Sequence, residues 1–123
     1  ITVFGGSQTR PNIHIRDMVR VYHHFLNRPE LRGIYNAGFE NLSIMEIAEM
    51  VAERIPSKIE VSSSNDPRSY RLCSTKLTDT GFSPKWGVDD AIGELIEKHR
   101  NNELFESPMN YNIKAMKELD TIR

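Results

Sequence analysis

The chain has 123 residues and almost balanced charge, with 16 Lys and Arg against 17 Asp and Glu and a formal net charge of −1. This length suits one domain, and 38% hydrophobic and 27% charged residues are ordinary for a folded protein. No hydrophobic run approaches the roughly 18–20 residues that cross a bilayer, so a membrane-spanning helix is excluded. The near-zero charge argues against a nucleic-acid partner.

The chain opens with a strand-like run, Ile1–Phe4, without an initiator Met or a signal peptide. Because a strand at the first residue needs others to pair with, the sequence suggests a piece of a longer protein. A second extended stretch is expected over 8–15, as an edge or a connector, since Pro11 has no N–H to donate. Ile13 and Ile15 would share one of its faces.

A first helix is predicted from Asp17, a good N-cap residue, to about Asn27, ahead of Pro29. The spacing i, i+3, i+4, i+7 marks its core-facing side chains as Met18, Val21, Tyr22 and Phe25. A short strand bounded by glycines is expected next, over 33–38.

The second helix has the clearest local signal, a capping box formed by Ser43 and Glu46. Leu42 and Ile47 match the hydrophobic staple that often precedes such a helix, and Pro56 should end it. Its predicted buried positions are Ile44, Ile47, Ala48, Val51 and Ile55.

The second half of the chain contains shorter elements. Strands are predicted over 58–62 and 70–73, joined by a polar loop over 62–67, and a short helix capped by Ser74 or Thr75 should end at Gly81.

A long helix is expected over 88–103, with Ile92, Leu95, Ile96 and His99 on one face and His99 at the edge of the core. A further helical segment is expected over 113–119. These elements predict a small α/β unit of α+β character, with short strands and three main helices.

The sequence lacks the common catalytic and cofactor motifs, including the glycine-rich dinucleotide fingerprint, the Walker A loop and the zinc-protease pair of histidines. A lone Cys73 forms no internal disulfide, and the four histidines have no metal-ligand spacing, so no metal site is expected. Arg10, beside Pro11, and Arg68, in a polar loop, remain as candidates for binding phosphate oxygens. Solvated surface arginines are the alternative interpretation.

Several motifs follow one another in an order that resembles the C-terminal part of extended short-chain dehydrogenases/reductases, the NAD-dependent sugar-nucleotide epimerase/dehydratase family. The resemblance covers residues 1 to about 97. It rests on Gly6-Ser-Gln8-Thr-Arg10, Ile15-Arg-Asp17, Gly33-Ile-Tyr-Asn36-Ala-Gly38, the Ser43 to Glu46 box, Asp66-Pro67-Arg68-Ser-Tyr70 with Lys76, Thr80-Gly-Phe-Ser-Pro84 and Val88–Ile92. The chain departs from the usual pattern at Pro11-Asn12 and at Thr80.

The resemblance implies a protein of two parts. An N-terminal Rossmann domain, absent from this chain, would bind NAD or NADP and supply a catalytic Tyr-x-x-x-Lys. Residues 1–103 would be the substrate-binding portion, and 104–123 a C-terminal tail that is partly helical. No tyrosine of this chain has a Lys four residues later, so no catalytic residue is expected in it.

The resemblance also assigns substrate-binding residues. Arg10 takes the position of an arginine that contacts the substrate diphosphate, Arg68 that of a second phosphate-binding arginine, and Asn36 that of an asparagine bordering the nucleotide. Gln8, in the same turn as Arg10, would reach substrate or cofactor. Cofactor-binding residues in this chain are not assigned.

We therefore expect the nucleotide-sugar-binding portion of an epimerase or dehydratase, inactive by itself. The alternative is a non-catalytic binding or regulatory module that reuses this half of the fold. The resemblance implies a cytoplasmic protein without a membrane partner, a homodimer at full length and a monomer as a fragment. It leaves open whether the reaction is epimerisation, dehydration, decarboxylation or reduction.

Overall fold

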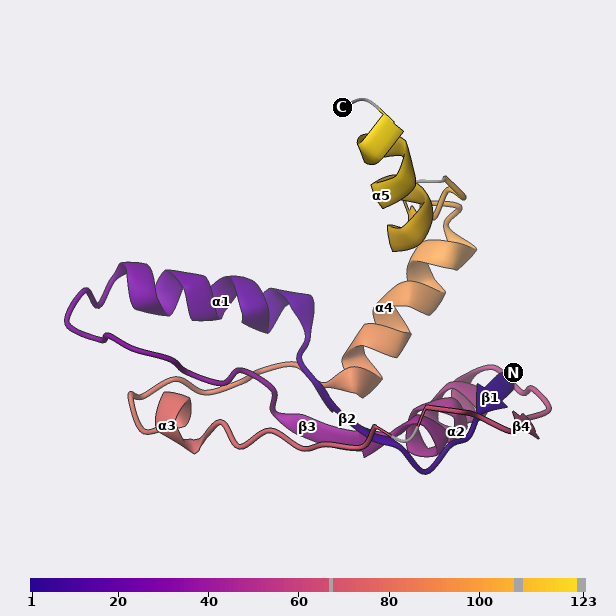
Figure 1. The fold of residues 1–123 in the computed structure, drawn as a ribbon, viewed down its shortest axis with the longest axis horizontal. Helices are drawn as coiled ribbons and strands as arrows, with labels where there is room; N and C mark the ends of the chain where they lie inside the picture. Colours follow the sequence, from indigo (N-terminus) through magenta and orange to yellow (C-terminus); the bar gives the residue numbers. More distant parts are fainter. Residues whose placement is uncertain (67, 108–109, 122–123) are drawn as a thin grey trace.

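The computed structural model describes residues 1–66, 68–107 and 110–121 (Figure 1). It has the mixed α/β character that the sequence predicts, with short strands between helices. No helix in these three ranges is long and hydrophobic enough to cross a membrane. The elements are β1 (Thr2–Phe4), β2 (Thr9–Asn12), α1 (Ile15–Leu26), β3 (Glu40–Ser43), α2 (Ile44–Arg54), β4 (Glu60–Ser62), α3 (Thr75–Thr78), α4 (Val88–Arg100) and α5 (Asn112–Thr121).

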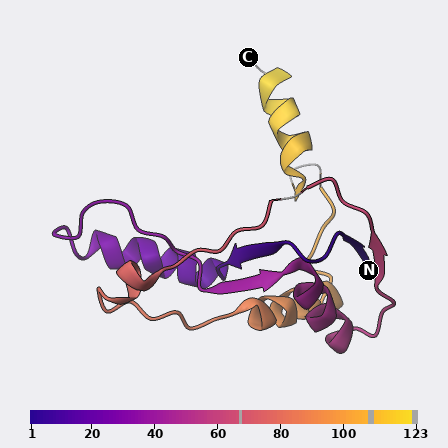
Figure 2. The ribbon, with the colours of Figure 1, turned by 60° about the horizontal axis from the view of Figure 1, so that its bottom comes forward.

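The strands form two separate pairs. β1 and β4 are parallel, with Val3 opposite Val61, so the long connection between them contains β2, α1, β3 and α2. β2 and β3 are antiparallel, with Arg10 opposite Leu42. α2 continues directly from β3 and packs against α4, and Figure 2 shows these two helices side by side.

The main core lies between α1, α3 and the segment after α3. Val21, Leu77 and Phe82 are its buried centre, and Leu77 is fully enclosed. Partly buried residues surround them: Ile13, Phe25, Tyr35, Ala37 and Phe39. Val3, Ala48 and Ile92 are also buried, on β1, α2 and α4. No strand pair here is wide enough to organise the chain alone, so packing of helices on extended segments carries the fold.

The first helix begins two residues before the predicted start, and the prediction of Asp17 as its N-cap is wrong. His14 is the N-cap, and its Nδ1 accepts a hydrogen bond from the Arg16 N–H at 3.2 Å. Ile15 therefore belongs to the helix and does not share a strand face with Ile13. The helix ends at Leu26 with Asn27 as its C-cap, as expected.

Asp17 instead lies in the first turn of α1, where its carboxylate is completely buried. It accepts backbone hydrogen bonds from Lys85 at 2.8 Å and from Trp86 at 2.9 Å, and it pairs with Arg20. Burial raises the pKa of Asp17, but the hydrogen bonds from Trp86, Lys85 and Arg20 outweigh it, so the pKa lies below its ordinary value.

Two predicted strands are absent. Residues 33–38 are extended but pair with no strand, because both backbone groups of Gly38 bond the Ser74 hydroxyl and Gly33 has a φ of +106°. Residues 70–73 are likewise extended, and the Asn41 side chain bonds both the N–H and the carbonyl of Leu72. Side chains here take the places that a neighbouring strand would occupy.

The second helix forms with the predicted cap, but of its predicted buried positions only Ala48 is buried, and Ile55, at the C-cap, is exposed. The Ser43 hydroxyl accepts the Glu46 N–H at 3.1 Å, and the Ser43 N–H donates to the Glu46 carboxylate at 2.6 Å. The helix ends at Arg54, two residues before Pro56. The short helix α3 also forms, and its N-cap Ser74 bonds Gly38 rather than the helix.

The helices of the C-terminal part differ in detail from expectation. α4 ends at Arg100 rather than residue 103, and His99 is exposed rather than at the core edge. Tyr22 of α1 is also exposed, against the prediction of a core position. α5 contains the predicted helical segment 113–119, while residues 108–109 and 122–123 of the tail lie outside the described residues.

We expect Asp17→Asn to lower the free energy of unfolding by roughly 3 kcal/mol at pH 7, because it removes the buried charge that Arg20 and two backbone N–H groups share. Because folding lowers the pKa of Asp17, its stabilising effect is complete above the pKa of the unfolded state, about 4, and is lost as the pH falls through the pKa of the folded state. Urea denaturation followed by circular dichroism should therefore show a smaller difference in the free energy of unfolding between wild type and variant at pH 3 than at pH 7. Glu49→Gln, at an exposed position, is the control, and a gap independent of pH would contradict the assignment.

Ser43→Ala should destabilise the protein by about 1 kcal/mol, because it removes the side-chain half of the capping box. Ser63→Ala, in an exposed loop position, is the matched control and should change stability by less than about 0.5 kcal/mol. Equal effects of the two substitutions on the urea midpoint would contradict the capping role.

Candidate functional site

The turn between β1 and β2 fixes the start of the candidate site. Gly5 and Gly6 adopt φ values of +82° and +104°, which glycine reaches without strain. Gln8 is buried beneath them: its Oε1 accepts the Gly6 N–H at 2.7 Å, and its Nε2 donates to the Phe4 carbonyl at 3.0 Å. The Gln8 side chain thus holds the turn that leads into β2.

Arg10 of β2 meets the loop after β4 through Asp66. Its Nη2 lies 3.2 Å from Asp66 Oδ2, and its Nη1 donates to the carbonyls of Thr9 and Arg68. The guanidinium also lies over the Tyr70 ring, 5.2 Å from its centroid. Three kinds of contact therefore fix the direction of this side chain.

Arg68 binds the same carboxylate, through both of its oxygens. Its Nε donates to Asp66 Oδ1 at 2.7 Å and its Nη2 to Asp66 Oδ2 at 2.8 Å. The Arg10 side chain is 22% exposed, whereas that of Arg68 is 77% exposed. Arg10 is the anchored member of the pair, and Arg68 is the one free to reorient toward solvent.

The electrostatics of this cluster, Arg10-Asp66-Arg68, leave a net positive charge. The hydrogen bonds from Arg68, with the charges of Arg68 and Arg10, hold the pKa of Asp66 far below its ordinary value. The bond to Asp66 likewise raises the pKa of Arg68. Two guanidinium groups share one carboxylate, so the cluster can accept an anion that competes with Asp66.

Asn36 lies apart from this cluster, in the extended segment beside α1. Its Nδ2 donates to the Cys73 carbonyl at 3.3 Å, and it lines a cavity of about 430 Å³. The cavity wall is mostly hydrophobic and includes the rings of Tyr22, Phe25 and Tyr35. Lys76 covers the Tyr35 ring, with Nζ 4.3 Å from the centroid.

The structure thus brings Arg10 and Arg68 together, places Gln8 beneath the turn that precedes Arg10, and places Asn36 in a separate cavity. Sequence reasoning did not identify Asp66 and Tyr70 as partners of Arg10, although both lie within the motif that contains Arg68. The spacing of Asp66 and Arg68, two residues apart, is the signal for a carboxylate that holds the arginine. Pro67 between them lies outside the described residues.

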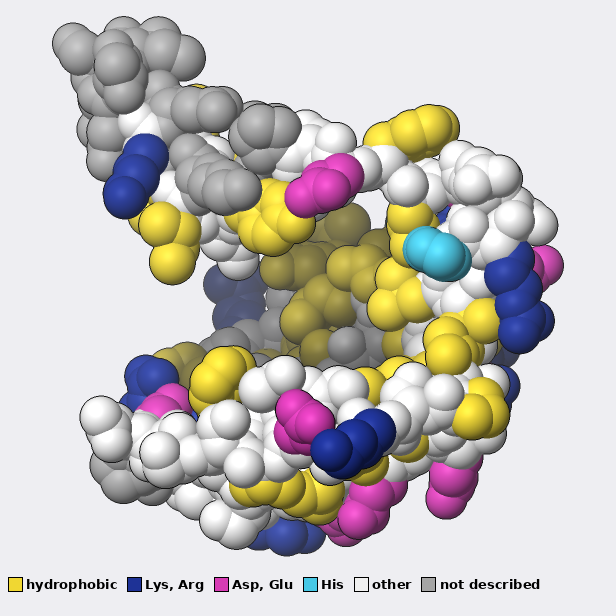
Figure 3. All heavy atoms as spheres, turned by 90° about the vertical axis from the view of Figure 1, so that its right-hand side faces the viewer, with side chains coloured by type: hydrophobic (Ala, Val, Ile, Leu, Met, Phe, Trp, Pro, Cys, Tyr) yellow, Lys and Arg dark blue, Asp and Glu magenta, His cyan; other side chains and the backbone are white. Residues whose placement is uncertain are grey.

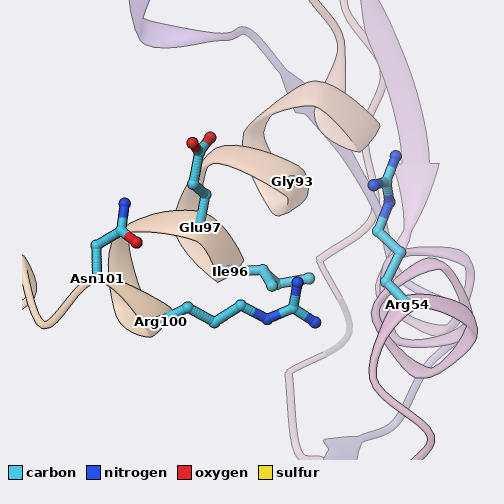
Figure 4. A pocket seen from close by; sticks show the side chains of 6 residues that line it. All are labelled: Arg54, Gly93, Ile96, Glu97, Arg100 and Asn101. Carbon is cyan, nitrogen blue, oxygen red and sulfur yellow. The ribbon is translucent and has the colours of Figure 1, made fainter.

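A second hollow, of about 400 Å³, lies between α2 and α4 (Figure 4). Arg100 extends from α4 toward α2, where Arg54 also lines the hollow. The Arg54 guanidinium already binds Asp89, and Glu97 lies beside the hollow, so its charges balance. The described part of the chain has no group of three or more His, Cys, Asp or Glu side chains placed to hold a metal ion.

Comparison with known proteins adds two kinds of relative, although no family model matches the chain. A putative anthocyanidin reductase from Ginkgo biloba is 31% identical over 88 residues, which are 69% of this chain and 26% of that protein. A dihydroflavonol 4-reductase from Dianthus caryophyllus is 26% identical over 106 residues, 82% of this chain and 29% of that protein. The chain therefore spans less than a third of the length of these relatives.

Solved structures share the fold at lower identity. The dTDP-glucose 4,6-dehydratase from Bacillus anthracis, in complex with NAD, has a TM-score of 0.72 at 19% identity, over 85% of this chain and 36% of that one. RMD from Pseudomonas aeruginosa, complexed with NADPH, has a TM-score of 0.64 at 21% identity, over 75% of this chain and 32% of that one. Together with the ordered motifs from Gly6 to Ile92, these relatives identify the chain as a member of the extended short-chain dehydrogenase/reductase family.

Proposed function

We propose that residues 1–103 are the nucleotide-sugar-binding portion of an NAD(P)-dependent enzyme of this family, and that Arg10 and Arg68 bind the substrate diphosphate. The observation that supports this most is the convergence of both guanidinium groups on Asp66. Two guanidinium groups therefore lie at one place on the surface, and the Asp66 carboxylate occupies the position in which they would bind an anion.

A diphosphate would compete with Asp66 for these donors. Each charge-assisted hydrogen bond contributes about 1.5–3 kcal/mol. The exposed Arg68 can turn from Asp66 to the ligand, while Arg10 keeps its direction through Tyr70 and the backbone of Thr9. These contacts would hold the nucleotide end of the substrate and leave the reacting carbon free to meet the cofactor.

Asn36 and Gln8 have different parts in this proposal. Asn36 would border the nucleotide from the wall of the cavity beside α1. Gln8 would act as a positioning residue, because its amide holds the turn before Arg10.

The cofactor belongs to the portion of the enzyme outside this chain. The two solved relatives carry NAD and NADPH, and the sequence of this chain has neither a dinucleotide fingerprint nor a Tyr-x-x-x-Lys. We therefore infer that the 123 residues alone bind substrate weakly and do not turn it over. We also propose that the full-length enzyme is cytoplasmic and homodimeric.

A second candidate substrate is a planar aromatic compound such as a flavonoid. The cavity beside α1 favours it, because the rings of Tyr22, Phe25 and Tyr35 offer stacking surfaces with an amide from Asn36. The sequence relatives are named for anthocyanidin and dihydroflavonol reduction. The two candidates differ in whether the ligand contacts the Arg10 cluster or occupies the cavity alone.

The test is an NMR titration of the 123-residue chain with UDP, dTDP and GDP at millimolar concentration, beside catechin. We expect the nucleotides to shift the amide signals of Arg10, Arg68 and Tyr70. Arg10→Lys keeps the charge but loses the donor fork, so it should weaken binding about tenfold. Arg32→Ala, at an exposed position away from the cluster, is the control and should bind as the wild type does.

Two results would contradict the diphosphate assignment. One is the absence of shifts near Arg10 and Arg68 with every nucleotide. The other is a response to catechin alone, at Tyr35 and Asn36, which would favour the flavonoid-like substrate. Unchanged binding by Arg10→Lys together with weaker binding by Arg32→Ala would reduce the interaction to general charge attraction.

A further inference from the structure

A third hollow, of about 380 Å³, lies between the C-terminal half of α1 and the segment that follows α3. Figure 1 shows these elements at the end of the molecule away from α2 and α4. Figure 3 views the molecule from the opposite end, where a wide hollow is lined mostly by hydrophobic side chains. The third hollow, which we call the basic hollow, differs in the cationic and polar side chains of its wall: Arg20, His23, His24, Asn27, Arg28 and Ser83.

The wall of the basic hollow carries an uncompensated positive charge. Arg20 pairs with the buried carboxylate of Asp17, which neutralises it. Arg28 instead donates to the backbone carbonyl of Thr80, and among the described residues no acidic side chain forms an ion pair with it. No Asp or Glu contributes to the wall in the part of the chain that the structure describes. The Arg28 guanidinium, with five N–H donors, therefore has both charge and donors left for a ligand.

The end of α1 does not account for this charge. Basic side chains near a helix C-terminus commonly offset the partial negative charge of its last carbonyls, and His23 and His24 lie in the last turn. The carbonyls of His23 and Phe25, however, already accept the N–H of Asn27. Arg28 reaches away from the helix to the segment that follows α3. The hollow therefore explains the position of Arg28 better than the helix end does.

Thr80, where the chain departs from the usual family pattern, organises the basic hollow. Its hydroxyl donates to the Leu77 carbonyl at 2.6 Å. Because that proton is committed, His24 Nε2, 2.7 Å from Thr80 Oγ1, must be the donor of the second bond. Neutral His24 is thus protonated at Nε2 and leaves Nδ1 free to take a proton. The Thr80 carbonyl holds Arg28, so this one residue fixes two of the basic side chains.

The charge of His24 depends on what occupies the hollow. Its ring packs edge-on against Phe25 and Phe82, with centroids 5.7 and 5.5 Å away. Burial and the charge of Arg28 lower the pKa of His24, and Glu30, outside the wall, acts in the opposite direction. On the facing segment, residues 80–83 have no titratable side chain. An anion beside His24 would offset the charge of Arg28 and favour the protonated ring.

We propose that the basic hollow binds the phosphoryl group of inorganic phosphate or of a phosphate monoester. Arg28 and the Asn27 amide would donate from α1, and the Ser83 hydroxyl from the segment that follows α3. The bond from Ser83 Oγ to the Pro84 carbonyl is 3.4 Å long, so this hydroxyl can turn to a ligand. Donors on two walls suit a tetrahedral group, whose oxygens point in several directions.

The charge of the site matches a dianion when His24 is protonated. Arg28 and a protonated His24 together carry two positive charges, and the exposed His23 adds to them in acid. The dipole of α1 opposes an anion at this end of the helix, so the side chains must supply the whole attraction. Binding should therefore strengthen as the pH falls.

The basic hollow is distinct from the Arg10-Asp66-Arg68 cluster. The 12 residues of α1 make a helix about 18 Å long. β2, which carries Arg10, joins α1 at its N-terminal end, whereas the hollow lies beside its C-terminal half. A ligand in the hollow would be a second anion, separate from the substrate diphosphate of the proposed function.

The test is an NMR titration of the 123-residue chain with sulfate at constant ionic strength. Sulfate stays a dianion between pH 5.5 and pH 8, so any change of affinity with pH comes from the protein. We expect shifts in the amide signals of Arg28, Gly81 and Ser83, and binding about fivefold tighter at pH 5.5 than at pH 8. Inorganic phosphate and glycerol 2-phosphate, compared at pH 8, then show whether the free anion or the ester binds more tightly.

Variants separate the site from general charge attraction. Arg28→Gln should weaken sulfate binding at least about tenfold, whereas Arg32→Gln, the same charge change at an exposed position outside the wall, should not. His24→Phe keeps an aromatic ring and should reduce the gain in affinity at pH 5.5 to less than about twofold. If Arg28→Gln does not fold, Arg28→Lys keeps the charge without the fork and should also weaken binding.

Four results would overturn the proposal. The first is the absence of shifts at Arg28, Gly81 and Ser83 at 50 mM sulfate. The second is equal weakening by Arg28→Gln and Arg32→Gln, which indicates general charge attraction. The third is an affinity that is the same at pH 5.5 and pH 8. The fourth is a set of shifts confined to the Arg10-Asp66-Arg68 cluster, which would leave the proposed function intact.

Discussion

The buried carboxylate of Asp17 is the contact on which the arrangement of this chain depends most. It belongs to the first turn of α1, but the N–H groups that it accepts come from Lys85 and Trp86, just before α4. Arg20 is the third donor to this carboxylate, and its guanidinium lies over the rings of Phe82 and Trp86. An unpaired carboxylate in this place would be costly, so α1 and the segment 82–86 are ordered together or not at all.

The same principle holds elsewhere in a chain that lacks a wide sheet. The Ser74 hydroxyl bonds both backbone groups of Gly38, the Asn41 amide bonds both groups of Leu72, and Glu40 accepts the Val88 N–H. Ser74 and Asn41 satisfy backbone groups that a strand neighbour would otherwise satisfy, and Glu40 satisfies an N–H that the first turn of α4 leaves unpaired. Extended segments are thereby held at fixed places without regular pairing, and the loop that carries Arg68 reaches Arg10 of β2 within this framework.

The elements that could be predicted from the sequence are those whose causes are local. Ser43 and Glu46 lie three residues apart, and their capping box forms as expected. The predictions for the cap of α1 and for the segment 33–38 are wrong because the deciding partners are distant in sequence: Asp17 bonds residues 68 and 69 positions away, and Gly38 bonds Ser74, 36 positions away. For the site, the resemblance pointed to Arg10 and Arg68, but no local rule gives their common contact with Asp66.

The exposed position of Tyr22 shows a second limit of prediction from the sequence. Hydrophobic periodicity finds a helix and the faces that avoid water, but it does not distinguish a face buried by this chain from one buried by another body. On α1 the periods of the two faces overlap, so Tyr22 fits the inner stripe with Val21 and Phe25 and equally the outer stripe with Val19 and Leu26. Geometry resolves the overlap, because Asp17 fixes the rotation of α1 about its axis. The buried carboxylate that orders the core therefore also determines which side chains of α1 face the core and which remain exposed.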